Sequence, residues 1–520
     1  MDDSEYGSKD KYSGEDSGAD GSAGGDTDTD TDTDGDTDTD SDTDGDTDTD
    51  TDCDTDTDTD SDSDNDGDSD GDADAGEDAG LNCDPVEKKV YYLSADDSNS
   101  MASPVIARWQ INGGGRVSTK IRIHEFLNYY GFHYQAAQEG RVNIVPQLRP
   151  ADEAEEGEYA LQIGVRAENR SNIDRRPFNL TFSLDTSGSM SGSPINRLKK
   201  ICLAVASNLK DGDVVSMVTW NNTQQVILDS HKVSGPDDTV FTAAINDIVA
   251  GGSTDLSSGL VKAYDLAQKN FDNDSINRVF LISDGQANTG VTDINLIKQH
   301  AKDPEKEGIY LLGAGVGNGY DDTLMDRVTD AGKGAYLFID SEDEAEIMFG
   351  KSSNMIANLD IAARDVRVEL DLPPGWLMKE FHGEEYSEEP EEVDPQHLAP
   401  NDAMIFHQLL ETCGDLPVTG GEEFVITAEY KDPFTYAKKS DSVTVTVDDM
   451  LDGANMSLAK GDAIVLYATA LERLKSMSGD SARDLIDEVK DRVDSAASAL
   501  GDDADLIEIS GLLAKYRNRF

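Results

Sequence analysis

The fold of this chain is decided by one stretch, Phe178-Asn179-Leu180-Thr181-Phe182-Ser183-Leu184-Asp185-Thr186-Ser187-Gly188-Ser189-Met190. Its first half is mostly apolar and favours β-structure, and an amphipathic helical pattern follows over residues 194–210. We therefore expect a strand that delivers one carboxylate and two hydroxyls into the loop where a helix begins. Hard divalent cations prefer oxygen ligands of this kind.

Strand and helix patterns alternate around this loop from residue 178 to about residue 350. The apolar runs predict strands at 178–184, 213–220, 225–229, 278–283, 308–314 and 335–339, and the helical patterns lie at 194–210, 237–248, 256–270, 293–302, 321–331 and 342–358. The strands at 278–283 and 308–314 are apolar throughout, which is typical of a parallel sheet covered on both faces. The alternation predicts a doubly wound (Rossmann-like) α/β domain over residues 176–350, with its ligand site at the carboxyl ends of the strands.

Two further loops of this domain carry oxygen ligands. Gly251-Gly252-Ser253-Thr254-Asp255 precedes an apolar helix and offers the hydroxyl of Thr254, and Ser283-Asp284-Gly285 follows an apolar strand and offers the carboxylate of Asp284. Each loop alone is more often an ordinary turn or a helix N-cap. All three in this order predict a cation site.

The candidate metal ligands are two carboxylates and three hydroxyls, from Asp185, Ser187, Ser189, Thr254 and Asp284. An octahedral Mg²⁺ or Mn²⁺ keeps several waters and accepts few direct carboxylates. We expect the hydroxyls to bind the metal directly and the aspartates to bind it directly or through water. An Asp or Glu of a protein partner would then complete the coordination sphere.

Residues 178–350 resemble a von Willebrand factor type A (vWA) domain, and the five candidate ligands match the metal-ion-dependent adhesion site (MIDAS) of that family. The chain is similar, more narrowly, to bacterial vWA proteins with a characteristic N-terminal segment. That similarity is carried by Arg122-Ile123-His124-Glu125-Phe126-Leu127-Asn128-Tyr129-Tyr130 and by the run from Asn277 to Thr292, although Gly113-Gly114-Gly115 replaces the more usual proline-containing turn. The resemblance covers about residues 95–450. It implies a non-enzymatic module that binds a protein through Mg²⁺, or through Mn²⁺ or Ca²⁺.

The rest of the chain divides by composition and periodicity. Residues 1–84 form an acidic Asp/Thr/Ser-rich tail that we expect to be disordered, and residues 85–175 form the N-terminal segment. Period-two patterns at 365–372, 424–428 and 442–447 predict an antiparallel β-rich domain over residues 351–450, as a small sandwich. Residues 451–520 turn helical and should form two or three helices that dock on the other domains.

The charge of the chain excludes some partners. Its net charge is −64, from 107 acidic and 43 basic side chains. Residues 1–84 hold 35 Asp and Glu against 2 Lys, which leaves a net charge of −31 for the rest. Such a chain repels nucleic acid and anionic membranes and suits cations, basic partners or a saline habitat. A simply solvated acidic surface remains the alternative interpretation.

The tail has two candidate roles. Asp occupies every second position from Asp26 to Asp74, and this self-repelling segment would act as an extended stalk, with Thr residues open to glycosylation. Loose calcium binding is the second, since residues 62–67 copy the first half of an EF-hand loop. Ala73 stands where that loop requires Glu, which argues against a true EF-hand.

We expect an extracellular or cell-envelope location, where the acidic tail would hold the body of the protein away from a surface. A cytoplasmic location is the alternative. No signal peptide is visible, and no run of 18 apolar residues suggests a transmembrane helix. A cytoplasmic vWA subunit would work with a separate ATPase, because this chain has no GxxxxGK[ST] motif. A metal-assisted hydrolase with Asp185 as nucleophile is a weaker hypothesis, because Ser187 stands where the general acid would be.

The cysteines do not suggest a zinc site, because no CxxC spacing occurs. Cys202 lies on the apolar face of the helix after the key loop and should be buried and inert. Cys83 and Cys413 either form a disulfide or remain free thiols.

Overall fold

The computed structural model describes residues 84–96, 99–151, 157–253, 255–285, 308–317, 322–414 and 416–520. These residues belong to one compact unit, Asp78–Phe520. Nearly all of the predicted acidic tail, the predicted helix 293–302 and the candidate ligand Thr254 lie outside the described residues.

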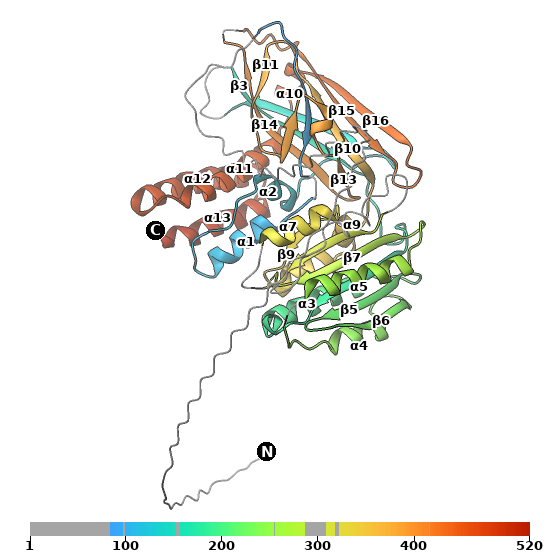
Figure 1. The fold of residues 1–520 in the computed structure, drawn as a ribbon. Helices are drawn as coiled ribbons and strands as arrows, with labels where there is room; N and C mark the ends of the chain where they lie inside the picture. The colour runs from blue at the N-terminus through green and yellow to red at the C-terminus, as the bar shows by residue number, and fades with distance from the viewer. Residues whose placement is uncertain are drawn as a thin grey trace, which may run out of the picture. The chain divides into compact units, whose positions relative to one another are not determined.

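The central domain contains a sheet of strand order β6-β5-β4-β7-β8-β9 (Figure 1). Its strands are β4 (Phe178–Asp185), β5 (Val214–Trp220), β6 (Gln224–Lys232), β7 (Ile276–Ser283), β8 (Tyr310–Gly315) and β9 (Tyr336–Phe338). All neighbours pair in parallel except β5 and β6, which pair antiparallel at one edge. The strand order reverses direction between β4 and β7, so the prediction of a doubly wound, mostly parallel sheet is confirmed.

Helices cover both faces of this sheet. They are α3 (Ser193–Ala206), α4 (Thr239–Asn246), α5 (Leu256–Lys269), α7 (Asp322–Ala331), α8 (Glu342–Ala345) and α9 (Ser352–Leu359), with the short helix η1 (Gly188–Met190). Alternate residues of β7 enter different cores: Phe280 packs with α3 and α4 residues, whereas Val279 packs with α5 and α7 residues. Burial on both faces explains why β7 is apolar throughout.

The prediction of one helix over residues 342–358 is wrong. The structure instead has α8, a π-helical turn at Glu346–Gly350 (η2), and α9. Gly350 is a poor helix former, and Lys351 has extended backbone angles (φ −97°, ψ 130°), so the helix ends and restarts there.

A β-sandwich packs its two antiparallel sheets around a shared core. One sheet has the order β12-β1-β10-β15-β16 with β13 paired to β10, and the other has the order β11-β14-β3-β2. The strands are β1 (Val90–Ser94), β2 (Asn143–Pro150), β3 (Glu158–Arg166), β10 (Ala363–Asp371), β11 (Trp376–Phe381), β12 (Glu385–Ser387), β13 (Gln396–Leu398), β14 (Ala403–Thr412), β15 (Glu423–Lys431) and β16 (Lys438–Thr446). The predicted β-rich domain therefore also takes three strands from the predicted N-terminal segment, and the α/β domain is inserted between β3 and β10.

A layer of helices joins the N-terminal segment to the C-terminus. It contains α1 (Ala102–Asn112), α2 (Ile123–Tyr129), α11 (Met456–Leu474), α12 (Gly479–Ala499) and α13 (Ala504–Tyr516); the short helices η3 (Pro390–Glu392), α10 (Val447–Leu451) and η4 (Arg517–Arg519) complete the described part of the chain. The aromatic stripe of α2 is buried, and Phe126 contacts Tyr467 of α11 at 5.7 Å between ring centroids. Helices α12 and α13 lie side by side (Figure 1). None of the helices in the described residues is both long enough and apolar enough to span a membrane.

The cysteines in the described residues differ in state. Cys202 is free and fully buried, and burial raises its pKa well above the usual value, as expected for an inert thiol. Cys413 is disulfide-bonded, and its partner lies outside the described residues. The pairing of Cys413 with Cys83 therefore stays a prediction.

Candidate metal centre

Two carboxylates stand at the same edge of the central sheet. Asp185 is the last residue of β4, and Asp284 directly follows β7. These strands are parallel neighbours, with Leu184 opposite Ile282, so their carboxyl ends lie together where the strand order reverses. Asp185 is completely buried and Asp284 is 1% exposed. The structure therefore places both aspartates at the carboxyl ends of neighbouring strands, where the sequence predicted them.

The loop after β4 brings two hydroxyls to this carboxylate. The backbone N–H of Ser187 donates to Asp185 Oδ1 at 2.8 Å, which curls the loop back onto the end of its strand. The hydroxyl oxygens of Ser187 and Ser189 then lie 3.0 Å apart. Ser187 is buried, whereas Ser189 in η1 is exposed. This arrangement is open to solvent on the Ser189 side.

Ser283 links the two carboxylate-bearing loops, a role that sequence reasoning missed. Its hydroxyl donates to Asp185 Oδ2 at 2.7 Å and accepts from the N–H of Gly285 at 3.0 Å. Both carboxylate oxygens of Asp185 therefore accept hydrogen bonds from neutral donors. The available signal was a hydroxyl at the last position of the strand before Asp284.

Electrostatics disfavour the charged form of Asp185 in the absence of a cation. Burial raises the pKa of Asp185 to about 6, and repulsion from Asp284 adds to this rise. The hydrogen bonds from Ser187 and Ser283 oppose the rise in pKa but do not cancel it. A divalent cation beside Asp185 would remove this electrostatic cost.

The loop at residues 251–253 is held against the Asp185 loop by backbone contacts. The N–H of Gly251 donates to Thr186 O at 2.8 Å, and the N–H of Gly188 donates to Gly252 O at 2.9 Å. Gly252 has φ +93°, and a Cβ there would lie 2.2 Å from Asn222 Oδ1, so the position requires glycine.

Asn222 is a second supporting residue that sequence reasoning missed. Its Oδ1 accepts the N–H of Ser253 at 2.6 Å, immediately before Thr254. The placement of Thr254 itself is not described, so its role as a ligand stays a prediction.

The donor set fits a hard cation. Every candidate donor is a carboxylate or hydroxyl oxygen, which suits Mg²⁺, Mn²⁺ or Ca²⁺ better than a soft metal. Within the described ranges, no group of three or more His, Cys, Asp or Glu side chains is placed to hold a metal. The structure brings Asp185, Ser187 and Ser189 together and places Asp284 beside them, while their role as ligands stays a prediction.

Comparison with known proteins identifies the domain. Residues 179–350 match the von Willebrand factor type A domain. The chain therefore contains a vWA domain. Domains of this family are commonly metal-dependent protein-interaction modules, and many bind the metal at the MIDAS. The family resemblance expected from the sequence is thus confirmed for the central domain.

The relatives of this chain match it over only part of their length. YfbK of Escherichia coli strain K12 is 30% identical over 269 residues, which cover 49% of this chain and 46% of YfbK. Inter-alpha-trypsin inhibitor heavy chain H2 of Mus musculus is 21% identical over 43% of this chain and 24% of its own length. This chain therefore spans about half or less of these two relatives. A solved von Willebrand factor type A structure from Catenulispora acidiphila has 13% identity and a TM-score of 0.45, covering 73% of this chain and 91% of its own.

Proposed function

We propose that the vWA domain binds a partner protein through Mg²⁺, and that the chain is not an enzyme. The ligands would be the two carboxylates and three hydroxyls predicted above: Asp185, Ser187, Ser189, Thr254 and Asp284. The observation that carries the proposal is the buried carboxylate of Asp185 at the switch point of a vWA sheet, whose hydrogen-bond donors among the described residues are neutral.

The open side of the site supports a partner carboxylate as the final ligand. Asp185 and Ser187 are buried beneath the loop, but Ser189 is exposed. A ligand can therefore approach from the side of Ser189. Bound Mg²⁺ would supply a Lewis acid that an Asp or Glu of the partner can coordinate. Ser283 and Asn222 would position the loops rather than contact the partner.

The same geometry argues against a hydrolase. A nucleophilic carboxylate must contact a substrate atom directly, but Asp185 is completely buried and both of its oxygens accept hydrogen bonds. A metal ion does not require this direct contact, because a carboxylate can bind it through a water molecule. Ser187 stands where the general acid of such a hydrolase would be, and a serine hydroxyl cannot take the place of a carboxylic acid in that role. A protein-binding role requires neither group to react.

We place the protein in the cell envelope or outside the cell. The disulfide at Cys413 supports this location, because disulfides persist mainly in oxidising compartments. The cytoplasmic alternative, with a separate ATPase, has no comparable support in the described residues. Detection of the Cys413 thiol in reduced form in protein isolated from its native cells would contradict the envelope assignment.

Calorimetric titration of the full chain with Mg²⁺ tests the metal site. We expect saturable binding by the wild type and by Asp211→Ala, which removes an exposed aspartate of the same domain. Asp185→Ala should abolish binding. The absence of heat and of thermal stabilisation with Mg²⁺, Mn²⁺ and Ca²⁺ in the wild type would overturn the proposal.

A pull-down with and without EDTA tests the protein partner. Immobilised wild type should retain a partner that EDTA releases, and Asp185→Ala should not retain it. A partner that stays bound in EDTA and binds Asp185→Ala equally well would not use this site.

A further inference from the structure

A second concave surface of the protein is basic. It has a volume of about 570 Å³ and is bordered by the loop before β9 and by β10, β15 and β16. Its basic residues are Lys333, Arg367, Lys431, Lys438 and Lys439, against only Asp365 and Glu429 as acidic ones. The chain as a whole carries 107 acidic and 43 basic side chains. An excess of positive charge in one concavity therefore runs against the composition of the protein. We call these residues the basic concavity.

Three of the cations in the basic concavity have no carboxylate partner among the residues that the structure describes. Lys431 pairs with Asp365 at 2.6 Å, and Lys439 pairs with Asp432 at 2.7 Å. In contrast, Lys333, Arg367 and Lys438 form no ion pair within this part of the chain. The Nε of Arg367 is buried and has no hydrogen-bond partner there. Lys333 and Lys438 are exposed and available to an anion. Arg367 donates through Nη2 to Val393 O at 3.2 Å and lies opposite Glu429 in the strand register, so it contributes charge to the concavity and is less accessible.

The strand register increases the local positive charge. Lys431 lies directly opposite Lys438 across the antiparallel pair β15 and β16. Like charges at such positions destabilise a sheet. A lysine on an edge strand such as β16 can also be explained by protection of the edge against aggregation, without any ligand. That explanation does not cover Arg367, which lies on the interior strand β10, or Lys333, which comes from the vWA domain.

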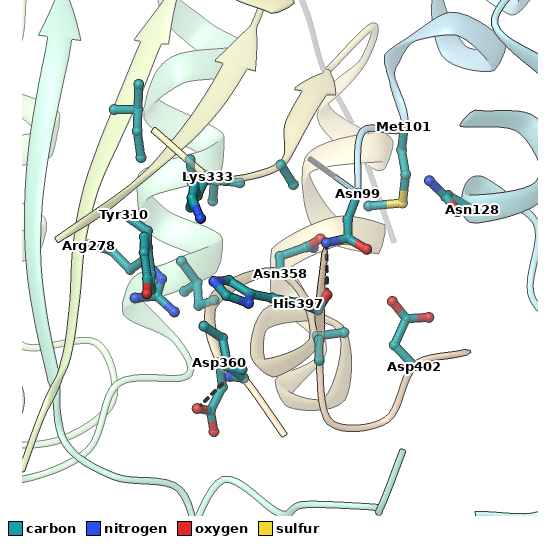
Figure 2. A pocket seen from close by; sticks show the side chains of 18 of the residues that line it. Asn99, Met101, Asn128, Arg278, Tyr310, Lys333, Asn358, Asp360, His397 and Asp402 are labelled. Carbon is teal, nitrogen blue, oxygen red and sulfur yellow. Dashed lines mark hydrogen bonds between the residues drawn. The ribbon is translucent and has the colours of Figure 1, made fainter. Parts of the chain in front are cut away.

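Lys333 also borders a smaller cavity, which Arg278 and Tyr310 line as well. Figure 2 shows these three side chains near one another at this cavity. His397 lines that cavity, and its Nδ1 accepts the N–H of Asp365 at 3.1 Å. Lys333 and Asp365 both have left-handed backbone angles, with φ of 49° and 47°. Residues with side chains adopt this conformation uncommonly, and such strain gathers at functional sites.

The basic concavity is separate from the metal loops. Lys333 lies at the amino end of β9, which runs parallel to β7 and β8. Asp185 and Asp284 lie at the carboxyl ends of β4 and β7. Lys333 and the metal loops therefore lie at opposite ends of the strands of the central sheet, and the other cations of the basic concavity belong to the sandwich.

We infer that the basic concavity binds an acidic peptide segment of a partner protein, without a metal ion. Arg367, Lys431 and Lys438 lie on the neighbouring strands β10, β15 and β16, which are about 4.8 Å apart, and Lys333 adds a cation from the loop before β9. Alternate side chains of an extended peptide recur about 7 Å apart, so more than one carboxylate can reach a cation. A short acidic peptide contacts only this local positive charge, whereas a long polyanion such as nucleic acid would also extend over, and be repelled by, the acidic remainder of a chain whose net charge is −64. This site goes beyond the metal-dependent function proposed above and does not depend on it.

Fluorescence anisotropy with a labelled peptide of alternating Asp and Ser tests this inference on the full chain. The peptide should bind the wild type equally well with and without EDTA, and a peptide with Asn in place of Asp should not bind. The double variant Lys333→Gln/Lys438→Gln changes two exposed side chains and should bind about tenfold more weakly. The matched control Lys120→Gln/Lys232→Gln removes two exposed lysines elsewhere and should bind like the wild type.

Four results would overturn the inference. They are no binding of the Asp peptide by the wild type, equal affinities of the two double variants, loss of binding in EDTA, and displacement of the peptide by inorganic tripolyphosphate that binds more tightly than the peptide. Loss in EDTA would assign the peptide to the metal loops, and tighter tripolyphosphate binding would assign the concavity to phosphate. A failed Mg²⁺ titration would leave this inference unaffected.

Discussion

Two buried aspartates of the vWA domain differ in whether their hydrogen-bond donors include a positive charge. The carboxylate of Asp213, beside the amino end of β5, accepts hydrogen bonds from both Nη atoms of Arg175 at 2.8 and 2.6 Å. It also accepts hydrogen bonds from two backbone N–H groups. Among the described residues, Asp185, at the carboxyl end of β4, receives hydrogen bonds from neutral donors, namely the backbone N–H of Ser187 and serine hydroxyls. Asp213 has its counter-charge within the chain, so it serves the fold. Asp185 has no such cation among its hydrogen-bond donors, which suits a residue that awaits a ligand from outside.

Breaking the Arg175–Asp213 pair should give the largest effect on stability. Asp213→Ala leaves a completely buried guanidinium without its carboxylate. Removing one partner of a buried pair typically costs about 3–5 kcal/mol. Urea unfolding should show this loss, while Lys269→Ala, at an exposed pair with Asp229, should cost about 1 kcal/mol or less. Similar losses for both variants would remove the distinction between the structural and the ligand-binding aspartate.

Addition of Mg²⁺ should stabilise the wild type and leave Asp185→Ala unchanged. A ligand at a hundred times its dissociation constant adds about 2.7 kcal/mol to the free energy of unfolding. The folded fraction of Asp213→Ala should keep this response, because its metal loops are intact. Thermal unfolding with Mg²⁺ and with EDTA measures the difference, and stabilisation of Asp185→Ala by Mg²⁺ would show that the metal binds elsewhere.

Asp402 extends the comparison to an aspartate outside the vWA domain. Burial raises its pKa to about 6, opposed by the N–H of Ala403 and by Arg166. The folded-state pKa lies above the unfolded value of about 3.9, so the charged form destabilises the fold above pH 6 and this cost disappears below pH 4. Asp402→Asn should therefore stabilise the protein by about 1–3 kcal/mol at pH 7.5. Urea unfolding at pH 7.5 and pH 4 checks the sign, and an equal gain at both values would contradict it.

Ser283 should show the smallest effect on stability and a clear effect on the metal. Ser283→Ala removes the hydrogen bond to Asp185 Oδ2, which is worth about 1 kcal/mol in stability. Loss of such a supporting contact typically weakens metal binding by about tenfold or more. Calorimetry with Mg²⁺ measures the affinity, and Ser283→Thr, which keeps the hydroxyl, should restore it. An unchanged affinity in Ser283→Ala would limit Ser283 to a structural role.

The candidate site was largely predictable because its chemistry is local. The spacing of Asp185, Ser187 and Ser189 within one loop predicts that their side-chain oxygen atoms lie close together. The apolar strand before Asp284 predicts that this residue lies at the end of a strand. Ser283 and Asn222 were not predictable as supporting residues. Their roles depend on which strand lies beside β4 and on which loop lies beside residues 251–253, and neither is visible in local spacing.

The fold was also predictable where its signals are local and not where it depends on distant contacts. Period-two and helical patterns located most strands and helices, but the break at Gly350 was missed because the surrounding residues continue a helical pattern. The pairing of β1 with β10, and of β3 with β14, also had no local signal. Each of these strands has an apolar face that several partners could have covered.

The sequence by itself determined the doubly wound alternation, the oxygen chemistry of the Asp185 loop and the acidity of the chain, because these follow from composition and short-range periodicity. Only the tertiary structure decided that strands before the vWA domain complete the sandwich after it, and that Lys333, Arg367 and Lys438 border one concavity. Contacts between residues far apart in the chain are selected by burial of complementary apolar faces, and this selection is a property of the whole packed molecule.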